Sequence, residues 1–279
     1  MNRKLTDIHA HLEQYTAEEL QSVLRRAEQA GVGWILTSGL DFKTSMDGVE
    51  LAVRHEGLLA AVGVHPWTAA QSFPADFPGR FSELLHRKVT VAVGEVGLDF
   101  VDNLFSGTPY RDNPELCGAQ ERALRMQIAL ACGAGLPLIV HCRGAYPRMI
   151  SILKEESAAR VGGVIHNFDE SREAANRLLG LGFLLSFGGA VSYPDAAALR
   201  DLARYVPLDG MLLETDSPYM PLYRQEAQKN EPANVAQVAR AVAAIKGIDL
   251  EELTDRTFEN FRALLKLESH ERGATPRSP

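Results

Sequence analysis

The sequence predicts an α/β fold in which eight β/α units close into one (β/α)8 barrel, a single domain. Short apolar runs rich in β-branched residues alternate with longer amphipathic stretches along nearly the whole chain, which is typical of a parallel sheet covered by helices. Eight such units can be counted. The chain has 279 residues, 46% of them hydrophobic, and this length suits one barrel with one large core.

The predicted strands follow one another at the spacing that such units require. They are Lys4–Ile8, Gly33–Ser38, Leu58–Val64, Thr90–Gly94, Leu138–His141, Gly163–His166, Phe183–Phe187 and Met211–Glu214. Between them, stretches such as Ala17–Ala30 and Gln120–Cys132 place apolar residues on one helical face. An open doubly wound sheet is the alternative, but it predicts a glycine-rich phosphate loop after the first strand, where this sequence has His-Ala-His.

Two segments depart from a minimal barrel. Phe100–Leu116 is too long and polar for an ordinary loop, so we expect an active-site flap there. The other segment is Tyr219–Pro232, which follows the eighth predicted strand. The barrel is assigned to residues 1–267, and the polar tail 268–279 is expected to be disordered.

Composition excludes several classes of protein. A net charge of −7 gives no basic face for binding a long duplex, so any nucleic-acid contact should be local. The three cysteines show no metal-site or disulfide spacing, and no secretion signal or membrane-length apolar run is evident. We expect a cytoplasmic enzyme with no membrane contact and no stable protein partner.

The first strand ends in a pair of histidines. His9 and His11 are two residues apart, so in an extended strand their imidazoles lie on one face and can hold one metal ion. Asp7 shares that face and could orient an imidazole through its second ring nitrogen. A strand end with two partly exposed histidines is the alternative for this pair taken alone.

Other strands end in residues of the same kind. Because the chemistry of such barrels lies at the carboxyl ends of the strands, these residues should meet. These residues are Glu95, His141, His166, Glu214 and Asp216. Taken alone, a carboxylate such as Glu95 could cap a helix and a histidine such as His141 could lie in the core. Taken together, the strand-end residues favour a metal site. His65 faces the same mouth, and we assign it to the substrate or a bound water, with a plain loop histidine as the alternative.

These motifs, in this order, resemble the TatD-type metal-dependent deoxyribonucleases of the amidohydrolase superfamily. The resemblance runs from about residue 5 to residue 267. It is carried by Asp7-Ile8-His9-Ala10-His11, Gly63-Val64-His65-Pro66, Gly94-Glu95-Val96-Gly97-Leu98-Asp99, Pro137-Leu138-Ile139-Val140-His141-Cys142-Arg143, His166-Asn167-Phe168, Glu214-Thr215-Asp216-Ser217-Pro218-Tyr219 and Asn230-Glu231-Pro232.

The resemblance implies a site for two divalent metal ions. His9, His11 and Asp216 would hold one ion, Glu95 would bridge, and His141 and His166 would hold the second. It further implies an exonuclease or phosphodiesterase that uses magnesium, manganese or zinc. The segment after His166 and the residue Gly144 depart from the family pattern, and both concern the substrate rim.

From the ligand chemistry we expect zinc as the bound ion, with magnesium or manganese as candidates for activity, because imidazoles favour transition ions. The metals would activate a hydroxide, with Asp216 as proton acceptor and Glu95 as the second catalytic residue. Glu214 could orient a ligand histidine or simply pack in the barrel.

Substrate contacts are expected at the rim of the site. Arg143 suits phosphate oxygens because of its guanidinium geometry, and Tyr219 and Trp67 could stack a base or pack in the wall. The expected substrates are DNA or RNA ends or a small phosphodiester. An amidohydrolase that cleaves a C–N or ester bond of a small molecule is the alternative, although its relatives often bridge their metals with a modified lysine where this chain has Glu95. A metal-binding protein without catalysis is a third hypothesis.

Overall fold

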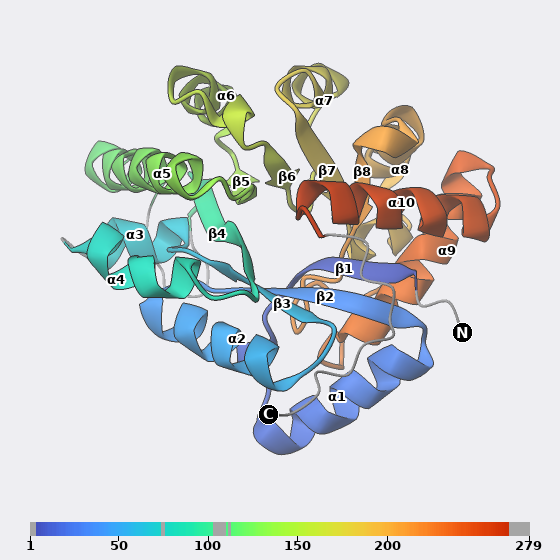
Figure 1. Ribbon diagram of the computed structural model, residues 1–279. Helices are drawn as coiled ribbons and strands as arrows, with labels where there is room; N and C mark the ends of the chain where they lie inside the picture. The colour runs from blue at the N-terminus through green and yellow to red at the C-terminus, as the bar shows by residue number, and fades with distance from the viewer. Residues whose placement is uncertain (1–3, 74–75, 103–109, 111–112, 268–279) are drawn as a thin grey trace.

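The structure is a computed structural model that describes residues 4–73, 76–102, 110 and 113–267. Within these residues, eight parallel strands follow in chain order around one sheet, each bonded to the next, and the predicted barrel is confirmed (Figure 1). The strands are β1 Leu5–Ala10, β2 Val32–Ser38, β3 Leu58–Val62, β4 Thr90–Asp99, β5 Leu138–Arg143, β6 Gly163–Ile165, β7 Phe183–Phe187 and β8 Met211–Leu213.

Helices connect successive strands outside the ring that the strands form, and two more follow the last strand (Figure 1). They are α1 Ala17–Gln29, α2 Phe42–Arg54, α3 Pro66–Ser72, α4 Phe77–Leu85, α5 Pro114–Ala134, α6 Tyr146–Glu155, α7 Arg172–Leu179, α8 Ala197–Tyr205, α9 Val235–Lys246 and α10 Leu250–Leu264. Short 3-10 helices cover Leu12–Gln14, Ala158–Arg160, Gly189–Ser192, Leu208–Gly210 and Pro232–Asn234. Local sequence sets several helix starts: Thr16 and Glu19 form a capping box at the start of α1.

The barrel closes between its first and last strands at the end of β1. Ala10 pairs with Ser217, the His11 N–H donates to the Ser217 carbonyl at 2.7 Å, and the Asp216 N–H donates to the His9 carbonyl at 2.9 Å. Residues more than two hundred positions apart in sequence thus become neighbours. The same backbone bonds that close the barrel bring Asp216 beside the two histidines of β1.

Two apolar layers fill the molecule. One lies between the strands and the surrounding helices, and the other fills the barrel itself. The inner layer includes Ile8, Leu36 and Ile139 from the strands, and it ends on Phe261 and Leu265 at the end of α10. Because α10 packs against β1 and β8 over this layer, one end of the barrel is apolar and covered. The polar strand ends gather at the other.

β4 extends further than the sequence pattern predicts. We expected it to stop at Gly94, but it runs to Asp99 and pairs Gly97 with His141 and Asp99 with Arg143. Gly97 permits this close pairing, because its φ is +149° and an added Cβ would lie 1.8 Å from the His141 carbonyl oxygen. The extension places Glu95 and Asp99 on one strand, next to the end of β5.

The sequence also predicts a disordered C-terminal tail, an active-site flap and no membrane contact. The tail 268–279 and most of the expected flap, residues 103–109 and 111–112, lie outside the described residues. Among the helices that the structure describes, none combines the length and apolar content needed to cross a bilayer.

Candidate metal centre

The two histidines of β1 converge on one point inside the barrel mouth. Their Nε2 atoms lie 3.2 Å apart, and the rings stand at 86° to each other. The Nδ1 atom of each ring faces Ser38 at the end of β2: the Ser38 carbonyl lies 2.8 Å from His11 Nδ1, and its hydroxyl 3.2 Å from His9 Nδ1. Ser38 therefore orients both imidazoles so that the Nε2 lone pairs point toward a common centre.

Glu95 lies between two sets of imidazoles, with one carboxylate oxygen toward each. Oε2 lies 3.4 Å from Nε2 of His9 and 3.5 Å from Nε2 of His11. Oε1 lies 3.0 Å from Nδ1 of His141 and 3.0 Å from Nε2 of His166. The side chain is 3% exposed. A carboxylate in this position has the geometry to connect two groups of metal-ligating atoms.

Asp216 completes the group on the β1 side. Its Oδ1 lies 3.6 Å from Nε2 of His9 and 3.4 Å from Nε2 of His11. Its φ is +55°, a left-handed conformation that is uncommon for a residue with a Cβ and that recurs at functional sites. Its side chain is 14% exposed, so Asp216 borders the open mouth whereas the His9 side chain is fully covered.

His141 and His166 form the group on the opposite side, and each is held by a carboxylate behind it. Asp99 Oδ2 lies 3.2 Å from His141 Nε2, which leaves Nδ1 facing Glu95. Glu214 Oε1 lies 3.4 Å from His166 Nδ1, which leaves Nε2 facing Glu95. These contacts fix which nitrogen of each ring is free to bind a cation. Glu214 thus contacts a predicted ligand histidine, and it also accepts a hydrogen bond from the buried Ser186 hydroxyl, so it makes both of the kinds of contact that we expected.

His65 lies within reach of the same carboxylate but differs from the other four histidines. Its Nδ1 accepts a hydrogen bond from the Trp67 N–H at 3.2 Å, as the N-cap of α3. In the neutral ring the proton then lies on Nε2, which is 3.4 Å from Glu95 Oε1. His65 lies close enough to Glu95 and His141 to form a metal-binding group by distance alone. A nitrogen that carries a proton donates a hydrogen bond and cannot bind a metal ion. This favours the role that we expected for His65, a contact with the substrate or with a bound water.

The charges of this cluster depend on one another. Burial raises the pKa of Glu95, but the imidazoles of His65, His166 and His9 outweigh it and hold that pKa well below its usual range. Burial lowers the pKa of His11, yet Asp216 and Glu95 prevail and raise it to about 9. Glu95 and Asp216 are ionised, and the extra proton on His11 lies where a cation would bind. Cation binding must therefore release protons.

The donor atoms fit divalent transition ions. Three groups of side chains have ligand atoms within 4.8 Å of one another among the described residues: His9 with His11 and Asp216, His9 with Glu95 and His166, and His65 with Glu95 and His141. Imidazole nitrogens with carboxylate oxygens are the ligands that zinc and manganese accept in hydrolases. The arrangement can hold cations close to an ionised carboxylate and an open mouth.

Asp7 contacts a different partner from the one we expected. Its Oδ1 accepts the Thr215 N–H at 2.9 Å and the His9 N–H at 3.3 Å, and its Oδ2 accepts the Thr215 hydroxyl. Its hydrogen bonds therefore go to backbone and hydroxyl groups, and none of them goes to an imidazole. Asp7 ties β1 to the end of β8, while Ser38 orients the imidazoles. Burial raises the pKa of Asp7 to about 8, despite the hydrogen bonds from Thr215.

The loop after β8 is held by one buried asparagine. The Asn230 side-chain amide donates to the carbonyls of Thr215, Tyr219 and Met220 at 2.7, 2.8 and 3.0 Å. Tyr15 in turn donates its hydroxyl proton to the Asn230 carbonyl. This network secures the residues on both sides of Asp216.

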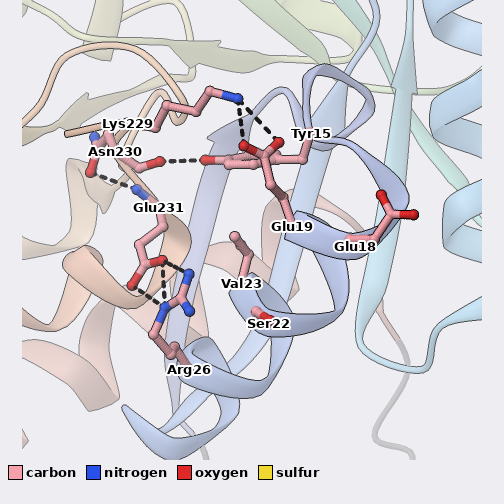
Figure 2. A pocket seen from close by; sticks show the side chains of 9 residues that line it. All are labelled: Tyr15, Glu18, Glu19, Ser22, Val23, Arg26, Lys229, Asn230 and Glu231. Carbon is pink, nitrogen blue, oxygen red and sulfur yellow. Dashed lines mark hydrogen bonds and ion pairs between the residues drawn. The ribbon is translucent and has the colours of Figure 1, made fainter.

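Behind this loop lies a groove that is separate from the metal centre (Figure 2). Figure 2 shows two ion pairs among its side chains: Lys229 Nζ lies 2.9 Å from Glu19, and Arg26 Nη2 lies 2.6 Å from Glu231. None of the predicted metal ligands lines it. The pairs brace α1 against the β8–α9 loop, so we assign the groove a structural role.

The predicted substrate contacts lie around the rim. Arg143, at the end of β5, has a side chain 44% exposed, and its Nε is 3.6 Å from Asp99 Oδ1. Tyr219 is 48% exposed, and its ring centroid lies 5.8 Å from that of His11. Trp67 lies across the mouth, with its ring 4.9 Å from His65 and 6.5 Å from His141. All three border the metal centre.

Two residues with clear roles were missed by sequence reasoning. Asp99 follows Glu95 by four positions on the same strand, so period-two alternation could have placed both on one face. Ser38 was assigned only as a strand end. One of its two contacts with the imidazoles is made by its backbone carbonyl, so no side-chain pattern could have indicated that it orients His11.

The comparisons with known proteins identify the family. The family model described as TatD related DNase matches residues 6–266. The chain belongs to the TatD DNase family. The predicted family is thereby confirmed, and with it the class of metal-dependent hydrolases.

Relatives in the TatD family match over nearly their full length. An uncharacterized metal-dependent hydrolase of Bacillus subtilis, YabD, is 35% identical over 265 residues, covering 94% of this chain and 99% of its own. The 3'-5' ssDNA/RNA exonuclease TatD of Erwinia amylovora is 32% identical over 257 residues, covering 90% and 95%. Among solved structures, YjjV, a TatD homologue from Escherichia coli, superposes with a TM-score of 0.87 at 29% identity, covering 96% of this chain and all of the other.

Proposed function

We propose that this chain is a two-metal phosphodiesterase that acts on the ends of single-stranded DNA or RNA. The observation that supports it most is the position of Glu95, whose two oxygens face two separate sets of ligand atoms. One divalent cation would be held by His9, His11 and Asp216, the other by His141 and His166, with Glu95 shared.

The ligand set favours zinc as the resident ion. Four of the six residues offer imidazole nitrogens, whereas magnesium prefers oxygen-rich sites with several waters. Manganese and magnesium are proposed as further ions that could support turnover. Divalent ions in such a site lower the pKa of water toward about 7 and draw charge from the oxygens of a phosphate.

An anionic substrate suits the charge of the loaded site. Two divalent cations exceed the charge of Glu95 and Asp216, so a phosphodiester brings the centre closer to neutrality. Arg143 adds a half-exposed guanidinium whose donors match phosphate oxygens. Asp99 holds that side chain at the rim, beside the centre.

The chain's own residues can carry the protons of the reaction. Asp216 is ionised, because burial, which would raise its pKa, is outweighed by His11 and the neighbouring imidazoles. It borders the open mouth and is placed to accept a proton from the attacking water. His65 presents Nε2–H to the same space and can donate a hydrogen bond to a phosphate oxygen.

The substrate class follows from charge and from the relatives. The net charge of −7 gives no broad attraction for duplex DNA, which favours short single-stranded ends. The Erwinia relative is named as an exonuclease on single-stranded DNA and RNA, and we propose the same substrates here. The three cysteines are free, and we propose a cytoplasmic enzyme on that ground.

The test is hydrolysis by protein that has been freed of metal and reloaded with zinc, manganese or magnesium. Substrates are single-stranded DNA and RNA oligonucleotides labelled at either end, nicked duplex DNA, and a small aryl phosphodiester. We expect nucleotides to be released stepwise from one end. Asp216→Asn should lower kcat by about 10²- to 10⁴-fold. Asp209→Asn, a change at an exposed carboxylate beside β8, should leave kcat unchanged.

Two outcomes would contradict the proposal. One is the absence of phosphodiester cleavage by metal-loaded protein with every ion and substrate. The other is turnover of lactones or cyclic amides in its place, which would make the chain an amidohydrolase of small molecules.

A further inference from the structure

Two aromatic side chains lie beside different histidines of the candidate metal centre. Tyr219 follows β8 and lies beside His11, with ring centroids 5.8 Å apart. Trp67 follows β3 and lies beside His141, with ring centroids 6.5 Å apart. Strands β8 and β1 form one side of the barrel and β3 to β5 the other, so the two rings face the centre from different sides.

Between the two rings the site residues form a continuous row. His11 Nε2 is 3.5 Å from Glu95 Oε2, and Glu95 Oε1 is 3.0 Å from His141 Nδ1. The row thus runs from Tyr219 through His11, Glu95 and His141 to Trp67. If a phosphodiester were bound at Glu95, in the middle of this row, the nucleoside on one side of the phosphate could reach Tyr219 and the nucleoside on the other side could reach Trp67.

The two rings differ in exposure, and the backbone of each residue is held by a hydrogen bond. Tyr219 is 48% exposed, and its backbone carbonyl is held by the Asn230 amide at 2.8 Å. Trp67 is half-buried, and its backbone N–H is fixed to His65 at 3.2 Å. Both are therefore anchored through the backbone while the ring lies by the mouth. Anchored aromatic rings beside a cationic centre are what nucleobases stack on, because every base has a π face.

We infer that Tyr219 and Trp67 form a two-sided base clamp, in which the nucleosides on the two sides of the scissile phosphate stack on different rings. The inference rests on the proposed function and narrows it. The preferred substrate carries a base on each arm of the phosphodiester. A small phosphodiester or a nucleotide with one base would lose the contribution of one ring.

The kinetic test uses a thymidine dinucleotide and its analogues with an abasic residue on the 5′ side, the 3′ side or both. Loss of either base should lower kcat/KM of the metal-loaded wild type by about 5- to 150-fold. Trp67→Ala should abolish the sensitivity to one base and Tyr219→Ala the sensitivity to the other. Trp67→Phe and Tyr219→Phe should restore most of it, since a ring remains. Tyr205→Ala removes a tyrosine of similar exposure on α8 and should change nothing.

A binding measurement tests base stacking on the two rings without any hydrolysis. A non-hydrolysable dinucleotide carries 2-aminopurine on one side or the other, and its fluorescence is quenched when the base stacks. In the wild type both positions should be quenched on binding. Tyr219→Ala should relieve the quenching at one position and Trp67→Ala at the other, with the thermal melting temperature of each variant confirming that it folds.

The two tests separate the clamp from the proposed function. If the oligonucleotides are never cleaved, the proposed function fails, while the fluorescence result still decides the clamp. The clamp is overturned if the dinucleotide does not bind, if it binds unquenched, or if both variants act on the same base. Equal kcat/KM for the dinucleotide and both single-abasic analogues would also overturn it.

Discussion

Oδ2 of Asp99 lies 3.2 Å from Nε2 of His141, and the other ring nitrogen, Nδ1, faces Glu95. Asp99 is completely buried, and its Oδ1 accepts the Val101 N–H at 3.0 Å. A carboxylate held this way fixes the imidazole and increases its affinity for a cation. We therefore propose Asp99 as a positioning residue for His141 in the candidate centre.

Asp99→Asn is expected to weaken binding at one half of the centre alone. The cation at His141 and His166 should bind about 10- to 100-fold more weakly, because the charge behind the imidazole is lost. The cation at His9, His11 and Asp216 should bind as in the wild type. Titration of metal-free protein in a metal-buffered solution measures both affinities. Asp201→Asn, at an exposed position on α8, is the control, and equal weakening of both sites would contradict the assignment.

Gly97→Ala is expected to distort the pairing of β4 with β5. Its added Cβ would lie 1.8 Å from the His141 carbonyl oxygen at a φ of +149°, which no small movement relieves. We expect a loss of about 3 kcal/mol in the free energy of unfolding, together with loss of cation binding. Denaturant unfolding measures the first and metal titration the second.

Gly133→Ala is the matched control for that change. Gly133 lies inside α5 with no atom within 4 Å of an added Cβ. There alanine should stabilise the protein by about 0.5–1 kcal/mol through its helix propensity. Equal stability of Gly97→Ala and the wild type would show that the close pairing of these strands is not required.

Removing the metal should make stability depend on pH above neutrality. In the metal-free protein the pKa of His11 is raised from 6.5 to about 9. The stabilisation from its protonated form is complete below pH 6.5 and is lost as the pH rises through about 9. Burial lowers the pKa of His9 and His65, so those two do not titrate in this window. Despite burial, the pKa values of His141 and His166 are raised by the carboxylates beside them, and burial raises the pKa of Asp7 to about 8, so these three groups add to the same loss.

The measurement is the melting temperature of metal-free and zinc-loaded protein between pH 6.5 and 9. The metal-free protein should lose roughly 5 °C over that range, and the zinc-loaded protein less, since its imidazoles are already deprotonated. His11→Gln should reduce the loss without abolishing it, whereas His55→Gln, a change at the end of α2, should leave it at the wild-type size. A melting temperature that rises with pH in the metal-free wild type would contradict the predicted direction.

Much of the fold could be predicted from the sequence, because local patterns carry it. Each strand is an apolar β-rich run followed by a helical pattern, and eight repeats of that unit leave few alternatives. The six predicted ligands were found for the same reason: they terminate strands, and the carboxyl ends of parallel strands meet. The structure does bring these six side chains together. Their role as metal ligands stays a prediction.

What sequence reasoning missed depends on contacts between strands. The hydrogen bonds of Asp7 go to Thr215, a residue just after β8, and no local pattern near Asp7 reveals that partner. The contact of Asp99 with His141 requires β4 to continue past Gly97 beside β5. The contribution of Ser38 comes partly from a backbone carbonyl, and every residue has one.

The central claim is that Glu95 joins two cations that act together on a phosphodiester. The most direct test is the rate of oligonucleotide hydrolysis as zinc or manganese is added stepwise to metal-free protein. We predict little activity with the first equivalent and a steep rise with the second, and with Glu95→Gln no such rise at matched metal concentrations. Full activity at one equivalent per chain, or unchanged activity in Glu95→Gln, would contradict the account.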